Sequence, residues 1–335
     1  MQMDTGSIRG LKTRRIGNIL ARRELVPFAL LIVVLIVSMS LSASFRDLSY
    51  ILRTSTRYME LGMTALTMTL IVTAGMIDLS VPAVMCCSAT VTALLFHAGL
   101  PMAASIVFGI LTGIGCGTIN GLLIAYFNLP AMIVTIGTMN LFRGISQIFI
   151  GDKSQGAFPQ WFNSFEKKTL FSVGGANFGI TLFIFLLVAA FFYLLLHRTG
   201  FGRKIFAVGA NEQAAIHSGI NTRQVKLSLF IMSGFVSALM GILTMSRLLL
   251  VRYDMHLNSE IDVVIMVLLG GADINGGRGS IIGTVIAVIL VIIMKTGLIV
   301  ANITSDAQMF VMGLILLVSI IIPNISSLLQ EMKDK

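Results

Sequence analysis

The sequence predicts an all-α integral membrane protein with about ten transmembrane helices, a broken or re-entrant eighth segment and an internal repeat. Its 335 residues are 56% hydrophobic and only 12% charged, which is too little charge for a soluble domain of this size. No Asp, Glu, Lys or Arg occurs from Leu79 to Phe142. Because a helix rises about 1.5 Å per residue and the hydrocarbon core is about 30 Å thick, this run must cross the bilayer several times.

The apolar runs are continuous rather than alternating, which favours helices over a β-barrel. They form one transmembrane domain, 25–326, between a basic N-terminal segment, 1–24, and a tail, 327–335. No small-residue cleavage site follows the first run, so we expect it to remain as a span and not to be removed as a signal peptide. The predicted spans are 25–45, 59–77, 82–98, 101–126, 131–150, 175–197, 227–246, 261–271, 280–300 and 307–326.

The eighth span is too short to cross the bilayer. Only ten uncharged residues separate Asp262 from Asp273, and they would form about 15 Å of helix, roughly half a membrane. Glycines follow at positions 270, 271, 276, 277, 279 and 283. The segment is therefore either a broken helix or one limb of a re-entrant hairpin.

The distribution of Lys and Arg sets the orientation. Basic residues are concentrated in 1–24 and 198–226, which the positive-inside rule assigns to the cytoplasm together with both termini. Cytoplasmic loops of this kind explain the net charge of +9 better than nucleic-acid binding does. The predicted outer segments carry Arg46, Arg53, Arg57, Lys153, Lys167, Lys168, Arg247 and Arg252.

Three features inside the bundle have structural explanations. A stripe of glycines on the fourth span would let another helix approach closely, and Asn120 beside it would bond to a neighbouring helix. The three cysteines lie in apolar runs and are expected to be buried without a disulfide framework. The segment 151–174, which holds Trp161, is predicted to be an outer loop at the membrane interface. The stripe consists of Gly109, Gly113, Gly117 and Gly121, and the cysteines are Cys86, Cys87 and Cys116.

The segment 198–226 contains a short predicted helix. Asn211 is a good N-cap, Glu212 suits the first turn, and Gly219 suits the C′ position after the last turn. A helix of about two turns is stable only when it packs against something. The segment is either a connector on the membrane surface or a docking element for a cytoplasmic partner, and the residues alone do not favour one of these.

Two stretches match in pattern. Gly75–Pro82 and Gly270–Gly277 each have a glycine, an aspartate three residues later and a small polar residue two further on. Asp78 thus matches Asp273, and many transporters build a central site from such paired breaks. The alternative is two aqueous turns of similar composition, against which the short eighth span argues for the second copy.

Ionisable residues at membrane depth are candidates for function, so Asp78 and Asp273 come first and Glu60 third. The chain has no G-x-x-x-x-G-K-[ST] loop and no H-E-x-x-H motif, and its four histidines lack metal-ligand spacing. We therefore expect no catalytic residues, no bound metal, no cofactor and no ATP bound through such a loop.

Five stretches occur in a characteristic order along the chain. They are Met76–Val81, Thr118–Leu123, Ile136–Met139 with Arg143 and Gly144, Phe201–Arg203 continuing into Ala207–Glu212 and Ser218–Ile220, and Leu268–Gly283. Together they resemble the membrane permease subunit of ribose/arabinose/rhamnose-type ABC sugar importers, within the branched-chain amino acid/sugar permease superfamily. The resemblance covers about residues 53–323.

The resemblance implies a multi-pass protein of the bacterial inner membrane that carries a monosaccharide or an autoinducer-2-like sugar inward. It implies three partners besides the bilayer: a cytoplasmic ATPase chain, an extracytoplasmic sugar-binding protein and a second permease, identical or related. It favours docking of 198–226 on the ATPase. The implied coupling residues are Gly202, Arg203, Asn211, Glu212, Ala214, Ala215, Ser218 and Gly219. The family usually has glycine at Pro82, where proline would stiffen the turn.

Sugar hydroxyls suit uncharged hydrogen-bonding side chains, so the candidate substrate pathway comprises Ser80, Asn120, Thr135 and Asn275. For Asp78 and Asp273 we favour capping of broken helices over contact with sugar. The alternatives are an ion-coupled transporter with these aspartates as ion sites, and an uncoupled channel or scaffold. The residues assigned to the helix breaks are Gly75, Asp78, Gly270, Gly271, Asp273, Gly276, Gly277 and Gly279.

Overall fold

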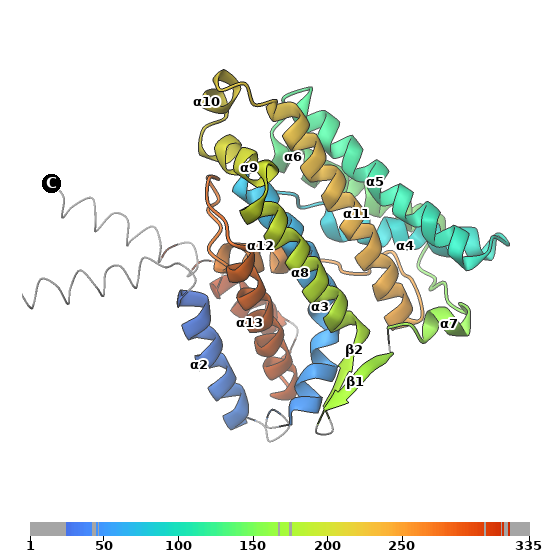
Figure 1. Cartoon of the computed structure of the whole chain (residues 1–335). Helices are drawn as coiled ribbons and strands as arrows, with labels where there is room; N and C mark the ends of the chain where they lie inside the picture. Colours follow the sequence, from blue (N-terminus) through green and yellow to red (C-terminus); the bar gives the residue numbers. More distant parts are fainter. Residues whose placement is uncertain are drawn as a thin grey trace, which may run out of the picture.

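The computed structural model describes residues 25–41, 45, 47–166, 168–173, 176–304, 306–315, 317 and 321. Predictions for the segment 1–24, for Arg46, for Lys167 and for the tail 327–335 lie outside these residues. The described chain is a bundle of helices with one small sheet (Figure 1).

Within the described residues, five helices are long and apolar enough to cross a membrane, in agreement with the predicted membrane class. The other predicted spans overlap shorter apolar helices or helices with polar ends. The five are α5 (Met102–Ala125), α6 (Ala131–Ile150), α8 (Ile180–Arg198), α11 (Thr222–Leu248) and α13 (Ile281–Val300). The others are α2 (Leu25–Leu41), α3 (Leu48–Thr73), α4 (Val81–His97), α12 (Glu260–Leu269) and the helix Asp306–Ile315.

The short eighth span is confirmed as a half-length helix. α12 has ten residues, so it is about 15 Å long. Its C-cap is Gly270, and Gly271 follows in the left-handed region with φ of +89°. The loop 270–280 then leads to α13.

The segment between α6 and α8, predicted as a loop, contains short regular elements. This segment contains the one-turn helix α7 (Gln160–Asn163) and the antiparallel strands β1 (Thr169–Val173) and β2 (Ala176–Gly179). The rings of Phe171 and Phe178 stack across the strands with centroids 4.8 Å apart. The sixth span therefore begins at residue 180 and not at 175. Gly174 and Gly175 were a hairpin signal in the sequence.

The segment 198–226 holds two helices, where one was predicted. The predicted helix is α10 (Glu212–His217), and it is preceded by α9 (Gly200–Ala210). Glycines at positions 200, 202 and 209 disfavour a helix locally, so α9 was missed. It forms because Thr199 caps it by accepting a hydrogen bond from the Gly202 N–H, and because it packs against α8.

The glycine stripe on α5 is confirmed as a packing surface. α5 lies along α11 (Figure 1). A Cβ on Gly117 would overlap the carbonyl oxygen of Phe230, and one on Gly113 would meet the carbonyl oxygen of Gly234 at 2.5 Å. Gly109 lies in the same way against Thr92 of α4. The three helices thus pack backbone to backbone.

Buried polar and sulfur groups join the rest of the bundle. The three cysteines are buried and free, as predicted.

Two ion pairs connect helices inside the bundle. Arg247 of α11 donates from Nε to the Glu60 carboxylate at 2.7 Å, and Glu60 is completely buried. Lys295 of α13 pairs in the same way with Asp262 of α12. These ion pairs tie α3 to α11 and the half-length α12 to α13.

We predict that Gly117→Ala destabilises the bundle by about 1–3 kcal/mol, because the added methyl group overlaps a carbonyl oxygen that cannot rotate away. Thermal unfolding of the detergent-solubilised protein measures this. Gly115→Ala is the matched control, since a Cβ there has nothing within 4 Å. Equal melting temperatures for the two variants would contradict the packing argument.

Candidate functional site

A buried hydrogen-bond network surrounds Asp78 in the loop between α3 and α4. Gly75, with φ of +80°, ends α3 and turns the chain back into the bundle. The Asp78 Oδ1 atom accepts from the Ser80 N–H at 3.0 Å and from the Ser80 hydroxyl at 2.6 Å. Oδ2 accepts from the Ser233 hydroxyl of α11 at 2.9 Å. Three donors therefore hold a carboxylate that is 3% exposed.

Three of the four predicted pathway residues meet at this loop. Asn120 of α5 donates from Nδ2 to the Ser80 hydroxyl at 2.8 Å, which confirms its predicted bond to another helix. Thr135 of α6 donates to the Ile77 carbonyl at 3.3 Å. Ser80, Asn120 and Thr135 are each 1% exposed or less. The network thus joins α4, α5, α6 and α11 and is closed to solvent in this conformation.

The loop 270–280 repeats one hydrogen bond of the loop between α3 and α4. Asp273 Oδ1 accepts from the Asn275 N–H at 3.2 Å, as Asp78 accepts from the N–H of Ser80. Both aspartates therefore form the turn in which a side chain bonds to the backbone two residues on. The two loops differ by one residue at the helix end. The glycine with positive φ is Gly75, three residues before Asp78, in the first loop, but Gly271, two residues before Asp273, in the second. The side chain of Asn275 is exposed and lies outside the Asp78 network.

The two helices that follow the aspartate turns each begin at a serine. Ser280 is the N-cap of α13 and accepts from the Gly283 N–H at 3.2 Å, and Asp273 shapes the loop before it. Ser80 is the N-cap position of α4, and Asp78 holds it in place. Pro82 lies in the first turn of α4, where the missing N–H of proline has no helical acceptor.

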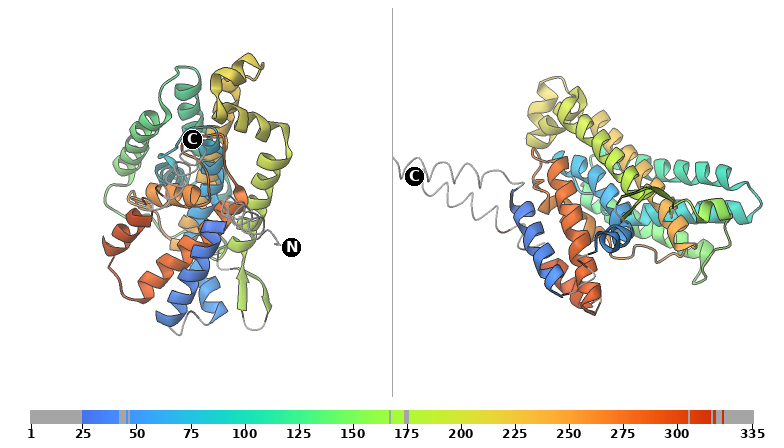
Figure 2. Two further views of the ribbon diagram at one scale, coloured as in Figure 1. Left: turned by 90° about the vertical axis from the view of Figure 1, so that its left-hand side faces the viewer. Right: turned by 60° about the horizontal axis from the view of Figure 1, so that its bottom comes forward.

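The predicted short helix α10 has the expected ends. Asn211 Oδ1 accepts from the Ala214 N–H at 2.9 Å, and Gly219 has φ of +81°. Glu212 forms an ion pair of 2.5 Å with Lys226 of α11. Ala215 is buried beneath the helix, whereas the side chain of Ile216 is 46% exposed. α9 and α10 lie at the end of the bundle opposite to β1 and β2 (Figures 1 and 2).

The remaining coupling candidates divide into buried and exposed positions. Gly202 is buried where a Cβ would overlap the Leu196 carbonyl oxygen, and Arg203 is exposed. The Ser218 hydroxyl donates to the Ala214 carbonyl at 2.9 Å.

Sequence reasoning missed Ser233, and it used Arg143 only as part of the family resemblance. Ser233 is one of several hydroxyls on α11, and nothing in its local pattern distinguishes it. Arg143 of α6 donates to the carbonyls of Tyr253 and Met255 in the loop after α11, at 2.8 and 3.2 Å. In that loop, burial, with Arg247 and Arg143 nearby, lowers the pKa of His256 to about 3, so its imidazole is neutral at pH 7.

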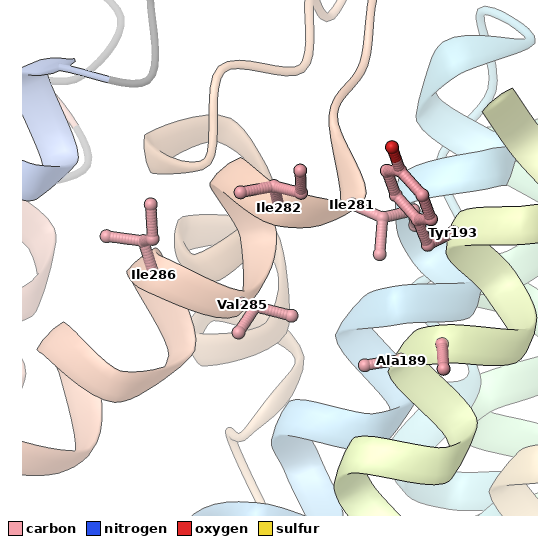
Figure 3. A pocket seen from close by; sticks show the side chains of 7 residues that line it. Ala189, Tyr193, Ile281, Ile282, Val285 and Ile286 are labelled. Atoms are coloured by element: carbon pink, nitrogen blue, oxygen red, sulfur yellow. The ribbon is translucent and has the colours of Figure 1, made fainter.

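An open pocket of about 220 Å³ lies between α8 and the start of α13 (Figure 3). It contains none of the predicted pathway residues. Its apolar wall does not suit a sugar, which needs hydrogen-bonding partners. The lining residues are Ala189, Ala190, Tyr193, Ile281, Ile282, Val285 and Ile286.

We predict that Ser233→Ala destabilises the protein by about 1.5–3 kcal/mol, because the buried Asp78 carboxylate loses a donor. Ser237→Ala, one turn further along α11, is the control, since the buried Ser237 hydroxyl has no hydrogen-bond partner among the described residues. Thermal unfolding in detergent compares the two. A loss at Ser237 as large as that at Ser233 would show that the bond to Asp78 is not the cause.

Comparison with known proteins identifies the family. The sequence model of the family described as "Branched-chain amino acid transport system / permease component" matches residues 50–320. The autoinducer 2 import system permease protein LsrD of Escherichia coli (strain K12) is 31% identical over 317 residues, which are 93% of this chain and 94% of that protein. LsrD of Shigella flexneri is also 31% identical, and LsrD of Escherichia coli O157:H7 is 30% identical, over the same shares.

No solved structure matches the chain significantly. The family model nevertheless covers most of the sequence, and the relatives align along almost its whole length. The chain therefore belongs to the family of branched-chain amino acid transport system permease components.

Proposed function

We propose that this chain is the transmembrane subunit of an ATP-driven importer that moves a monosaccharide, or the sugar-like signal autoinducer 2, into the cytoplasm. The observation that carries the proposal is the alignment with LsrD permeases over 93% of the chain. These relatives are named as permease proteins of autoinducer 2 import systems. On this proposal the chain conducts substrate, and ATP hydrolysis takes place on a separate chain.

The proposed topology has ten membrane segments within one domain, 25–326, with both termini in the cytoplasm and α12 as a half-length segment. Its support is that α9 lies against the loops 74–80 and 270–280, so these three segments share one end of the bundle. The cluster of Lys and Arg in 198–226 favours the cytoplasm for that end.

α10 is proposed as the contact to the ATPase. Its ion pair with Lys226 holds it on the end of α11, and the exposed Ile216 offers an apolar anchor. An apolar side chain that becomes buried at the centre of an interface can contribute much of the binding free energy. A sugar-binding protein would dock at the opposite end of the bundle, and a second permease, identical or related, would complete the complex.

The Asp78 network is proposed as a structural anchor in the conformation described here. Its carboxylate already has three donors, and Ser80, Asn120 and Thr135 are closed off from solvent. Substrate would reach these side chains only if α4, α5 and α11 separated. Asn275, which is exposed, does not share this restriction.

Uptake into proteoliposomes tests the proposed function. The full-length permease is reconstituted with its cognate ATPase and binding protein, and labelled autoinducer 2 and ribose are supplied outside. We expect uptake of one of these that requires ATP inside. Uptake driven by a proton or sodium gradient without ATP would contradict the proposal.

We predict that Ile216→Asp weakens ATPase binding about tenfold or more, because an apolar anchor is replaced by a charge. Co-purification of the ATPase at graded concentrations measures the effect. Leu170→Asp is the control, since Leu170 is exposed to a similar degree on β1, at the other end of the bundle. Unchanged ATPase binding by Ile216→Asp would rule out α10 as the contact.

A further inference from the structure

Three segments from distant parts of the sequence contact one another at glycine residues. Gly75 lies in the loop after α3, Gly209 in the last turn of α9, and Gly276 in the loop after α12. A Cβ built on Gly276 would lie 2.7 Å from the Gly209 carbonyl oxygen and 2.8 Å from the Gly75 Cα. One built on Gly209 would overlap the Thr73 carbonyl oxygen and lie 2.5 Å from the Gly277 nitrogen. We call these four glycines, 75, 209, 276 and 277, the glycine junction.

The closest contacts at the junction are made by backbone atoms. The Gly277 N–H donates to the Thr73 carbonyl at 2.8 Å, which fastens the loop 270–280 to the end of α3. The atoms nearest to the missing Cβ positions of Gly209 and Gly276 are all backbone atoms, so no side-chain rotation could make room for a methyl group there. At Gly75 the nearest atom is 3.6 Å away, and the restriction is its φ of +80°. Figure 1 shows the loop after α12 rising to the end of α9, and Figure 2 shows it beside the same helices from another side.

The junction lies between the cytoplasmic helices and the interior network. α10 follows α9 after the single residue Asn211, so a displacement of α10 moves the end of α9 directly. On the other side, Asp78 is three residues beyond Gly75 and is bonded to Ser233 of α11. The loop 270–280 leads into α13 in the same way.

We propose that the glycine junction is the point through which movement of α9 and α10 reaches both helix breaks at once. Direct backbone contact transmits a displacement, whereas flexible side chains between the segments could absorb part of it by rotating. Gly209 and Gly276 act in this as positioning residues, and neither is assigned contact with substrate. The inference rests on the proposed function, because it assumes that an ATPase moves α10.

Gly209→Ala tests the junction in the complete complex of permease, ATPase and binding protein in proteoliposomes. Alanine favours a helix more than glycine does, so any loss must come from the contacts of Gly209. We expect the ATPase to remain bound and to hydrolyse ATP within twofold of the unmodified rate. Uptake of labelled autoinducer 2 or ribose per ATP should fall at least tenfold.

Gly200→Ala is the matched control in the same helix, since a Cβ there meets only the end of the Arg203 side chain, at 3.5 Å. It should leave uptake per ATP unchanged. If the unmodified complex shows no ATP-dependent uptake, the proposed function fails. If it does, and Gly209→Ala takes up as much substrate per ATP, or loses ATPase binding in proportion to uptake, the junction proposal is wrong.

A second pair of variants applies even if Gly209→Ala does not fold. A Cβ on Gly279 would overlap the Thr73 hydroxyl, and it would lie 3.2 Å from the Thr73 Cβ. Gly279→Ala should therefore lower uptake per ATP, and Thr73→Ala in the same chain should restore at least half of it by removing that hydroxyl. No recovery in the double variant, with Thr73→Ala alone still active, would contradict a role for the contact between the α3 end and this loop.

Discussion

The structure depends on backbones that approach one another at glycine. In a membrane, an apolar side chain is in an apolar environment whether it contacts lipid tails or another helix. Moving a leucine from lipid into a helix–helix contact therefore gains little free energy. They associate through close contact, and here α5 and α11 reach it at Gly113, Gly117 and Gly234. The same kind of contact recurs at Gly209 and Gly276, where α9 meets the loop 270–280.

Polar groups inside the bundle are accommodated by pairing. Asp78 is surrounded by hydroxyl and amide donors, whereas Glu60 and Asp262 each have a basic partner on a neighbouring helix. An unpaired carboxylate at this depth would cost several kcal/mol. These contacts therefore specify which helices are neighbours, a choice that apolar packing in lipid leaves open.

Much of the organisation was predictable from single residues and their spacing. In the described part of the chain each predicted span overlaps a helix, because continuous apolar runs favour helices in a membrane. Two aspartates separated by ten uncharged residues predicted the short α12. Asn211 and Gly219 marked the ends of α10, because capping is a local effect of a side chain or of a positive φ. The hairpin β1–β2 and the helix α9 were missed, the latter because packing against α8 overrides its low local propensity.

The sequence by itself determined the membrane class, the ends of α10 and the presence of two matched aspartate turns, since each depends on residues close together in the chain. Tertiary structure alone decided what those turns touch. It placed Asp78 with Ser233, 155 residues away, and left Asn275 outside that network. It also brought Gly75, Gly209 and Gly276 together. No pattern in one segment encodes such contacts, because they form only when several helices have packed at a fixed distance.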